Sequence, residues 1–499
     1  MSNQEVSDHD AKNYAMLLDS GLLDSGHDET KKKNLKSSQK FNNANYDIFC
    51  CSPCLTLTKQ DASNCTSDGK LEIDKLSASL SQIKINLEEQ DPLKQMRDIL
   101  EQIKQNSFEV IKSDSNKIQD ADLPFNGGWL GYFSYDFGKS LELADKRKLI
   151  NNNIPFCSFG LYRWALISDH RKKTTRLYNF GLCENEWHKI KSFFDADKIG
   201  NTESAKGFEL NSRFESNINF ATYQKAFNKI QENIIAGNCY QINYSHQFSA
   251  PFKGCSFDAY KRLTEVNKSP FSAYLNFGEF QILSLSPERF IQVRNKKVLT
   301  QPIKGTSPRS SDKNTDLENA SNLLSSEKDR SENLMIVDLL RNDLSKTADT
   351  DSVKVPELFG LYTFESVHHL ISTVTSQLAP EYDMFDILQT CLPGGSITGA
   401  PKIAAMKIID ELEDFSRGIY CGVIGYMDFK GNMDTNISIR TLLAKDNELT
   451  CCAGGGIVFD STVKSEYQET YHKVSKIIPT LEDTFLNYSP DKNSIKEHG

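Results

Sequence analysis

The sequence predicts an α+β fold with large antiparallel sheets, and two patterns lead to this prediction. Short segments of alternating apolar and polar residues, bounded by turn residues, follow one another through the second half of the chain and are typical of strands. Segments with an apolar stripe at helical spacing flank these strands. They do not alternate with them one by one, as they would in a parallel α/β fold.

The first half of the chain contains fewer such patterns. Three polar stretches, residues 24–44, 58–70 and 195–217, have few apolar positions and are expected to be poorly ordered or to act as linkers. The last of them separates the two halves of the chain. The tail after residue 488 is also polar and is expected to fray.

The second half begins with a predicted helix over residues 222–236. Thr222 is suitable as its N-cap and Gly237 as its end, and one apolar stripe runs along it: Tyr223, Phe227, Ile230 and Ile234. Residues 239–248 then alternate as a strand. One face is largely aromatic and the other carries Gln241 and further polar residues, so the polar face is expected to meet water or a polar cleft.

The remaining elements follow the same two periodicities. Three strands are predicted over residues 280–285, 290–293 and 297–303. Two helices are predicted over residues 331–344 and 464–478. Ser326 is suitable as the cap upstream of the first of these helices.

The composition excludes several classes of protein. Hydrophobic residues make up 38% and charged residues 25%, as in soluble globular proteins, and the net charge of −9 argues against a nucleic acid or an anionic membrane as partner. No apolar run reaches the roughly 18 residues of a membrane span, and the start of the chain lacks the pattern of a secretory signal. We therefore expect a cytoplasmic protein with reduced cysteines. The cluster Cys50, Cys51 and Cys54 has no second ligand set at zinc spacing.

Lys304 is the first candidate for chemistry. It ends an apolar strand immediately before Gly305, where the backbone can turn sharply and a ligand can approach. A lysine in a dry site loses its proton more readily and becomes a nucleophile. On local pattern alone, the alternative is a strand-end lysine in water, because most lysines are exposed.

Three glutamates are candidates for binding a cation. Glu466 and Glu469 lie one turn apart on a predicted helix, and two such carboxylates can hold a hard cation such as Mg²⁺. Their alternative is a solvated face with an ion pair between Glu469 and Lys473. Glu332 extends an apolar helical stripe formed by Met335, Ile336 and Leu339. A carboxylate there requires a partner or a metal ion, unless it is only a first-turn glutamate favoured by the helix dipole.

Three glycine-rich segments complete the candidates, at residues 127–128, 394–402 and 453–456. The middle one resembles a P-loop, but Gly399 is followed by Ala-Pro-Lys, so ATP binding is not expected. Its backbone N–H groups can still bind a carboxylate. Structural turns are the alternative.

The order of these motifs is more specific than any one of them. Gln241 is followed by SPERF (286–290), PIKGT (302–306), ENLMIVDLLRNDL (332–344), VHHLIS (367–372), GGSITGAPK (394–402), IRTLL (439–443), AGGGIV (453–458) and SEYQETYHK (465–473). This series resembles the chorismate-binding domain shared by anthranilate, aminodeoxychorismate and isochorismate synthases, and it spans about residues 220–480. AMLLDSG (15–21) and GGWLGYFSYDFG (127–138) look like the amino-terminal domain of the same enzymes.

The resemblance implies two large antiparallel β-sheets packed as a sandwich with peripheral helices, as in anthranilate synthase component I. It also implies three segments along the chain. These are an amino-terminal region over residues 1–205, a chorismate-binding catalytic domain over residues 206–485, and a polar tail over residues 486–499.

Two positions favour the aminodeoxychorismate synthase type within this family. Lys304 is typical of it, whereas anthranilate synthases usually have alanine there, and Gln241 stands where isochorismate synthases carry the lysine that activates water. The implied enzyme is a transferase of the EC 2.6.1 class. It aminates chorismate at carbon 4 to form 4-amino-4-deoxychorismate, for 4-aminobenzoate and folate biosynthesis.

Three alternatives remain. An anthranilate synthase component I would form 2-aminobenzoate and pyruvate, with ammonia attacking carbon 2 directly. A salicylate- or isochorismate-forming enzyme is disfavoured by Gln241. A non-catalytic binding protein on the same fold would be expected to have lost its carboxylates.

The resemblance also implies roles for individual residues. The catalytic residues are Lys304, which attacks carbon 2, Glu288, which protonates the departing 4-hydroxyl, Gln241 and His369. Mg²⁺ is held by Glu332 and Glu469, with Glu466 nearby. The residues implied to bind the substrate are Thr398, Gly399, Arg440, Gly456 and Lys473.

Two partners are implied as well. No glutaminase module is visible in the two halves of the chain, so a separate glutaminase subunit is expected to supply ammonia, as a heterodimer. LLDSG (17–21) is similar to the LLES segment that contacts tryptophan in anthranilate synthases. Leu17, Asp19 and Ser20 are therefore candidates for holding a tryptophan.

Overall fold

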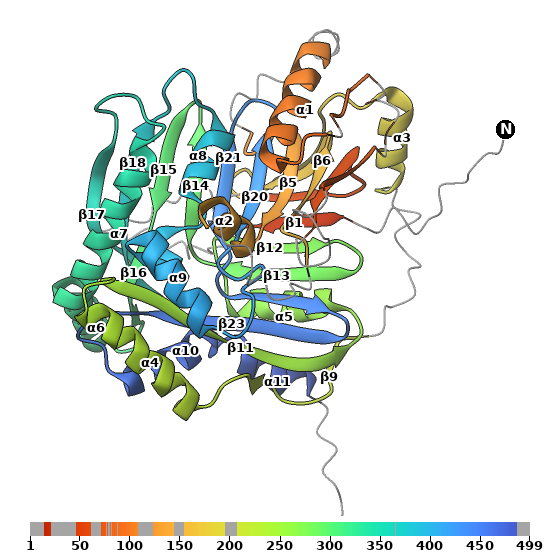
Figure 1. Ribbon diagram of the computed structural model, residues 1–499. Helices are drawn as coiled ribbons and strands as arrows, with labels where there is room; N and C mark the ends of the chain where they lie inside the picture. Colours follow the sequence, from red (N-terminus) through yellow and green to blue (C-terminus); the bar gives the residue numbers. More distant parts are fainter. Residues whose placement is uncertain are drawn as a thin grey trace, which may run out of the picture.

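The computed structural model describes most of the chain: residues 14–20, 46–60, 71–107 apart from 76, 78, 79, 81 and 87, 123–143, 154–194, 207–364 and 366–486. Two antiparallel sheets dominate this part (Figure 1). Strands β11, β23, β13 and β12 lie in the lower part of that view, and β14, β15, β20 and β5 lie above them. The predicted α+β class with two large antiparallel sheets is confirmed.

The first sheet contains 12 of the described strands. In spatial order they are β10 (Glu215–Ser216), β11 (Gln241–Lys253), β23 (Glu448–Ile457), β22 (Thr441–Lys445), β13 (Phe280–Ser286), β12 (Phe271–Asn276), β1 (Ala15–Asp19), β2 (Tyr46–Cys50), β7 (Trp164–Asp169) and β8 (Thr174–Asn179), with β9 (Glu209–Leu210) and β19 (Gly399–Ala400) also paired to β11.

The second sheet contains 11 of the described strands. In spatial order they are β16 (Ile303–Pro308), β18 (Val367–Gln377), β15 (Lys297–Gln301), β14 (Arg289–Arg294), β21 (Met433–Ile437), β20 (Val423–Asp428), β5 (Gly128–Phe133), β6 (Cys157–Tyr162), β3 (Leu55–Lys59) and β4 (Leu71–Lys75), with β17 (Lys354–Thr363) also paired to β18.

The two sheets pack face to face over one apolar layer. Met16 and Leu275 of the first sheet share a buried cluster with Leu130 and Ile424 of the second, and all four are at most 2% exposed. Burial of such a layer is the main driving force for folding. The predicted sandwich is therefore confirmed.

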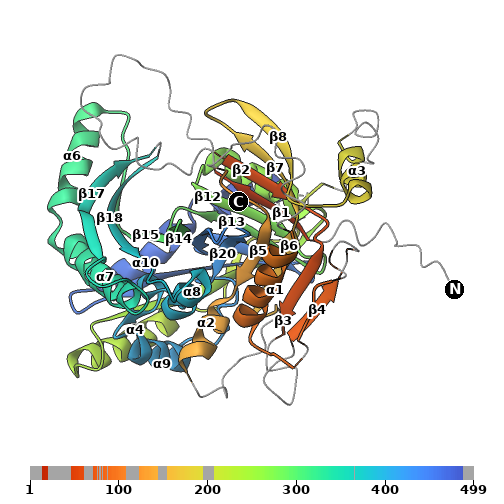
Figure 2. The ribbon, with the colours of Figure 1, turned by 90° about the horizontal axis from the view of Figure 1, so that it is seen from above.

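Helices cover the outer faces. Against the second sheet pack α1 (Pro92–Ser107), α7 (Glu327–Ser345) and α8 (Met384–Cys391), and against the first sheet pack α4 (Phe220–Ile235), α5 (Ser256–Val266), α9 (Lys402–Leu412) and α11 (Ile478–Phe485). The remaining helices are α2 (Tyr135–Glu142), α3 (Glu184–Ser192), α6 (Lys313–Ser325) and α10 (Val463–Val474). Seen from above, α6, α7, β17 and β18 lie at one side and α3, β3 and β4 at the other (Figure 2).

The helix predicted over residues 222–236 begins two residues earlier. Its N-cap is Asn219, whose side chain accepts a hydrogen bond from the Thr222 backbone N–H at 3.0 Å, so the prediction of Thr222 as the cap was wrong. Three residues of the predicted stripe, Tyr223, Phe227 and Ile230, are buried. The following strand starts at Gln241, and its polar face is buried within the protein.

Prolines account for two other differences. The strand predicted over residues 297–303 is interrupted at Pro302, which lacks a backbone N–H, and becomes β15 and β16. The helix predicted over residues 464–478 is shorter, because α10 ends at Val474 and α11 follows with a proline in its first turn. The strands predicted over residues 280–285 and 290–293 correspond to β13 and β14.

The helix α7 begins close to its predicted cap. The Ser326 side chain accepts a hydrogen bond from the Asp329 backbone N–H at 3.2 Å. Its buried stripe, however, runs through Ile336, Val337, Leu340 and Leu344 rather than through Met335 and Leu339. Glu332 therefore lies at the border of the buried face.

The polar stretches have mixed outcomes. Residues 24–44, 61–70 and the tail after residue 488 lie outside the described residues. The expectation of linkers was wrong for residues 58–59, which belong to β3, and for 207–217, which contains β9 and β10. Both sheets combine strands from the two predicted halves, since β1 pairs with β12 and β5 with β20.

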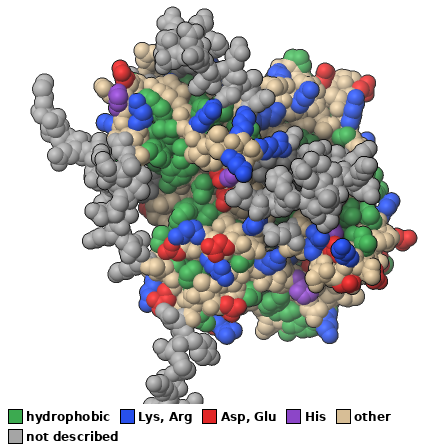
Figure 3. All heavy atoms as spheres, turned by 180° about the vertical axis from the view of Figure 1, so that it is seen from behind, with side chains coloured by type: hydrophobic (Ala, Val, Ile, Leu, Met, Phe, Trp, Pro, Cys, Tyr) green, Lys and Arg blue, Asp and Glu red, His purple; other side chains and the backbone are tan. Residues whose placement is uncertain are grey.

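Charge is mixed over the surface. Figure 3 shows acidic and basic side chains interspersed over the lower part of the face opposite to the view of Figure 1. Among the described residues, no helix is long and apolar enough to cross a membrane.

One ion pair lies fully inside the protein. The Arg417 guanidinium donates two hydrogen bonds to the Glu413 carboxylate, at 2.7 and 2.8 Å. It also donates to the carbonyl oxygens of Ile397 and Asn243, at 2.8 and 2.7 Å. Glu413 accepts in addition from the backbone N–H and the hydroxyl of Ser245. Both charges are thus satisfied without water.

We expect Arg417→Met to lower the free energy of unfolding by about 3–5 kcal/mol, because it leaves Glu413 buried without its counter-ion. The matched control is Arg341→Met, which removes an ion pair with Asp338 at 2.8 Å in which both side chains are more than half exposed. That change is expected to cost under about 1 kcal/mol. Denaturant unfolding of both variants is the measurement, and equal midpoints would contradict the role given to Arg417.

Candidate active site

The predicted site residues come from both sheets and two helices. Lys304 and His369 lie on β16 and β18 of the second sheet, and Glu288 immediately precedes β14. Gln241 and Gly456 lie on β11 and β23 of the first sheet. The remaining candidates lie on α7 (Glu332), on α10 (Glu466, Glu469, Lys473), at and just before β19 (Gly399, Thr398) and between β21 and β22 (Arg440).

Lys304 lies in a β-bulge. Ile303 and Thr306 of β16 are opposite Ile371 and His369 of β18, so two residues of β16 face one residue of its partner. Gly305 completes the bulge with φ +89°, a conformation that glycine adopts without strain. The Lys304 ammonium donates a hydrogen bond to the Ser396 carbonyl oxygen at 3.3 Å.

Glu288 is a buried acid next to this lysine. Burial raises the pKa of Glu288 to about 7, although the charge of Lys304 and a hydrogen bond from Ser396 oppose the shift. The carboxyl group is therefore poised to release or take up a proton close to neutral pH. Its position is fixed by its backbone, since the Glu288 carbonyl accepts from the Ile437 N–H at 3.1 Å.

Two of the three predicted cation ligands lie against a lysine that the sequence reasoning missed. The Lys328 ammonium is 3.3 Å from a Glu466 oxygen and 3.9 Å from a Glu332 oxygen. Burial raises the pKa of Glu332, whereas the charge of Lys473 lowers the pKa of Glu469. A signal for Lys328 was present, because it precedes Glu332 by one helical turn.

These carboxylates are close in space but are not a closed metal site. Glu466 and Glu469 both approach Gly455. If Gly455 carried a Cβ atom, that atom would lie 3.2 Å from a Glu466 oxygen and 3.6 Å from a Glu469 oxygen. In the described part of the chain, no three His, Cys, Asp or Glu side chains are grouped so that they could hold a metal ion. The binding of Mg²⁺ by Glu332, Glu466 and Glu469 stays a prediction.

Gly399 and Gly456 lack side chains, and this leaves the space that Gln241 occupies. Gly399 is opposite Ile242 in the sheet, and a Cβ on it would lie 2.1 Å from the Gln241 carbonyl oxygen. A Cβ on Gly456 would lie 2.6 Å from the Gln241 side-chain nitrogen. The nitrogen and the oxygen of the Gln241 side-chain amide are buried and have no hydrogen-bond partner among the described residues. Such a group is costly unless a ligand or water completes it.

His369 lies near Arg440. Burial and the charge of Arg440 both keep His369 uncharged. The His369 Nδ1 is 2.8 Å from the Thr306 hydroxyl, and burial lowers the pKa of the imidazole to about 3, with Arg440 adding to the shift. Arg440 has φ +51° and is half-buried. No ion pair of Arg440 with a carboxylate is found among the described residues, so its guanidinium is suited to an anionic ligand.

Thr398 and Lys473 are held by the protein itself. The Thr398 hydroxyl donates to the Gly394 carbonyl at 3.0 Å. The Lys473 ammonium donates to the Gly454 carbonyl at 2.8 Å and is 2.9 Å from a Glu469 oxygen. The ion pair between Glu469 and Lys473 that was the alternative to cation binding is therefore present.

The predicted tryptophan residues border a separate cavity of about 420 Å³. Asp19, Ser20, Phe271 and Arg294 line it, together with the ends of β20 and β21. Leu17 does not, because it packs on the outer side of the first sheet with α5 and α11, and its neighbour Leu18 lines the cavity instead. Neighbouring strand residues point to opposite faces, which explains the exchange.

Taken together, the main site offers an amine, a carboxyl group with a pKa near neutral, a set of carboxylates that attract a cation, and a guanidinium. These groups suit an anionic substrate that loses a leaving group. The cavity beside Asp19 shares none of its lining residues with this site.

Comparison with known proteins gives consistent results. A model of the chorismate binding enzyme family matches residues 52–479. The chain is 40% identical over 469 residues to aminodeoxychorismate synthase component 1 of Escherichia coli K12, covering 94% of this chain and 93% of that protein. It is 41% identical over 368 residues to anthranilate synthase component 1 of Pseudomonas aeruginosa, covering 70% and 74%.

Among solved structures, the fold is similar to the crystal structure of anthranilate synthase component I from Streptococcus pneumoniae TIGR4. The TM-score is 0.72 at 29% sequence identity, and the match covers 87% of this chain and 92% of that one. The expected relationship to the anthranilate synthase component I fold is confirmed.

Proposed function

The chain belongs to the chorismate binding enzyme family, and from this premise we propose that it aminates chorismate at carbon 4 to form 4-amino-4-deoxychorismate. The product is a precursor of 4-aminobenzoate and folate. The reaction is an amino-group transfer, and we expect it to take place in the cytoplasm. The observation that carries the proposal is a buried Glu288 whose pKa is raised to about 7 and which lies within the electrostatic influence of Lys304.

Lys304 and Glu288 divide the chemistry between them. The unprotonated Lys304 amine attacks carbon 2 of the ring while the double bond shifts and the carbon–oxygen bond at carbon 4 breaks. Glu288, protonated at the start, gives its proton to the leaving hydroxyl, which departs as water. Ammonia then forms a bond to carbon 4, the double bond shifts back, and the lysine leaves carbon 2. Two easier displacement reactions on the ring thus replace the direct displacement of the hydroxyl by ammonia.

Glu332, Glu466 and Glu469 would hold Mg²⁺. Their fit to a cation is supported by the Lys328 ammonium, which lies against two of them at 3.3 and 3.9 Å. When bound, the ion supplies Lewis-acid neutralisation of the substrate carboxylate. Arg440 would bind a second carboxylate, and the Gln241 amide, which has no partner in the part of the chain that the structure describes, would face the reacting ring.

Ammonia would come from a second subunit. The relatives bear the designation component 1, which implies a further component. We propose that this partner is a glutaminase. The rival function, that of an anthranilate synthase, is disfavoured by Lys304, since alanine is typical at this position in those enzymes.

The cavity beside Asp19 is proposed to hold a tryptophan. Its volume of about 420 Å³ is within the usual range for small-molecule sites. Phe271 and Ile48 offer apolar contacts to an indole ring, and the Arg171 guanidinium suits the carboxylate of an amino acid.

A product assay tests the proposed reaction. With chorismate, Mg²⁺ and an ammonium salt near pH 8.5, we expect mass analysis to find aminodeoxychorismate and no released pyruvate. Lys304→Met should lower kcat sharply, because the nucleophile is removed. Lys297→Met, which replaces an exposed lysine on the same sheet, is the control and should leave kcat unchanged. Anthranilate plus pyruvate as products would overturn the proposal.

The pH dependence of turnover tests Glu288. Since its pKa is raised to about 7, the acid form that donates the proton predominates below that pH and is lost above it. At a fixed concentration of unprotonated ammonia, kcat should fall as the pH rises through about 7. Glu288→Gln should lower kcat by about 10²–10⁴-fold and remove this descending limb. Persistence of the limb in the variant would assign it to another group.

Tryptophan release tests the cavity. Dialysed protein, once denatured, should free about one tryptophan per chain by mass analysis, as expected for a ligand enclosed between packed sheets. Ser20→Trp, which places an indole ring in the cavity, is the control and should release none. A wild-type protein that frees no tryptophan would contradict the proposal.

A further inference from the structure

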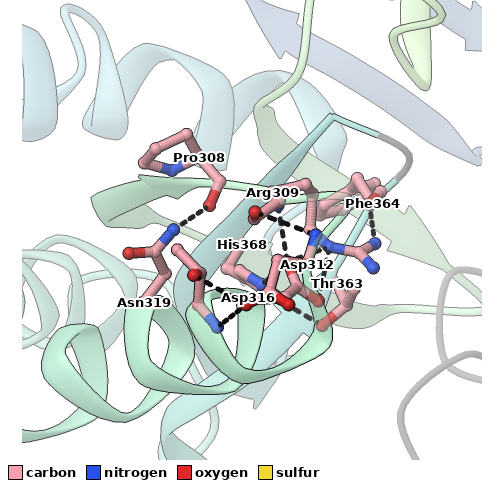
Figure 4. A network of polar contacts seen from close by, with 10 residues as sticks. Pro308, Arg309, Asp312, Asp316, Asn319, Thr363, Phe364 and His368 are labelled. Carbon is pink, nitrogen blue, oxygen red and sulfur yellow. Dashed lines mark hydrogen bonds and ion pairs between the residues drawn. The ribbon is translucent and has the colours of Figure 1, made fainter.

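A polar cluster lies behind β16, outside the site described above. Its centre is Asp316 in the first turn of α6, which accepts hydrogen bonds from the Arg309 Nε at 2.8 Å and the Ser310 backbone N–H at 2.9 Å (Figure 4). The His368 Nε2 is 3.1 Å from the same carboxylate oxygen. On the other side of the imidazole, Nδ1 is 2.9 Å from the Thr363 hydroxyl.

The cluster joins three elements at the end of β16. Arg309 directly follows that strand, Asp316 belongs to α6, and His368 belongs to β18. The Arg309 guanidinium also donates to the Phe364 carbonyl at 2.8 Å, and its backbone N–H donates to the Ser366 carbonyl at 3.2 Å. Asn319 of α6 adds a hydrogen bond to the Pro308 carbonyl at 3.0 Å. Hydrogen bonding to Arg309 holds the pKa of Asp316 well below its usual range, so the carboxylate stays charged.

β16 needs such support, because its own strand pairing is weak. Among the described strands it pairs only with β18, and it leaves the regular register at the bulge that carries Lys304. Edge strands and bulges are the places where register is least firmly fixed. A Cβ on Gly305 would lie 3.0 Å from Leu323 of α6 and 3.1 Å from Asp329 of α7, so these helices back the bulge closely.

The cluster is also connected to the opposite face of the same strands. His368 and His369 are consecutive on β18 and therefore point to opposite faces. His368 contacts Asp316, while His369 contacts Thr306, two residues after Lys304. Phe364, whose carbonyl is bound by Arg309, packs its ring edge-on against His369 with ring centres 5.4 Å apart. Movement of the cluster would therefore reach both Lys304 and His369.

We propose that Asp316 is a positioning residue: through Arg309 and His368 it fixes the register of β16 against β18, and so aims the Lys304 amine into the site. This inference rests on the proposed function, because it takes Lys304 as the reacting amine. The residues that would bind the substrate, among them Arg440, Gly456 and Lys473, do not belong to β16 or β18. Loss of the cluster should therefore impair the reaction more than substrate binding.

Asp316→Asn tests this directly, because the amide keeps the shape and loses the charge that binds Arg309. We expect kcat to fall by about 10–100-fold, the size of effect that small misplacements of reacting groups produce, while KM for chorismate stays nearly constant. The matched control is Asp338→Asn on α7, whose partner Arg341 is at 2.8 Å on the surface. It should leave both parameters unchanged.

A second measurement does not depend on turnover. The rate at which trinitrobenzenesulfonate modifies Lys304 is followed by peptide mass analysis, and it should change in Asp316→Asn but not in Asp338→Asn. His368→Gln retains a donor toward Asp316 and should keep most of the activity, whereas His368→Ala should not. If Asp316→Asn does not fold, the comparison of His368→Gln with His368→Ala tests whether the cluster positions Lys304.

Each outcome bears on the inference. Unchanged kcat and unchanged Lys304 labelling in Asp316→Asn would overturn it, as would a change confined to KM. Equal activity of His368→Gln and His368→Ala would overturn it as well. If the wild-type protein forms no aminodeoxychorismate, the proposed function fails, but the labelling rates still report whether the cluster positions Lys304.

Discussion

The arrangement of the site depends on two charges that have no access to water. The pair of Arg417 and Glu413 joins the backbone of β11 to the turn that precedes Thr398. Taking both ions out of water is costly, and the cost is offset only because nearly every donor and acceptor has a partner. The centre of the Tyr135 ring lies 4.7 Å from the guanidinium and adds a cation–π contact. Gln241 and Gly399 can then meet at contact distance, because their two segments are held at a fixed separation.

Burial and neighbouring charge give the carboxyl groups of one site different properties. Desolvation raises the pKa of Glu288, whereas Lys473 lowers that of Glu469, which stays ionised. The same residue type thus has a pKa near neutrality in one place and stays ionised beside a lysine in another. Lys304 lies between these environments, since its charge influences Glu288, Glu332 and Glu469 alike.

Local patterns in the sequence were sufficient for much of the fold and less so for the site. The cap at Ser326 and strands β13 and β14 depend on neighbouring residues, so they could be predicted. The motif order named residues that lie near one another in the structure, whereas Leu17 does not line the cavity beside Asp19 and Ser20. Lys328 was recognisable by helical spacing, whereas the contact of Asp316 with His368 spans 52 positions and has no local signal. Strands β9 and β10 were missed because so short a pairing depends on β11 rather than on their own residues.

Because both sheets pair strands that are far apart in the sequence, neither sheet can be completed early in synthesis of the chain. β1 is paired on one side with β12, and β5 with β20, so strands made early must wait for partners made hundreds of residues later. Non-local pairing slows folding and leaves apolar strand edges unprotected in the meantime. A nascent chain that has emerged from the ribosome only as far as β8 has two incomplete sheets and no closed core. We therefore expect chaperones that shield such edges to raise the yield of this fold in the cell.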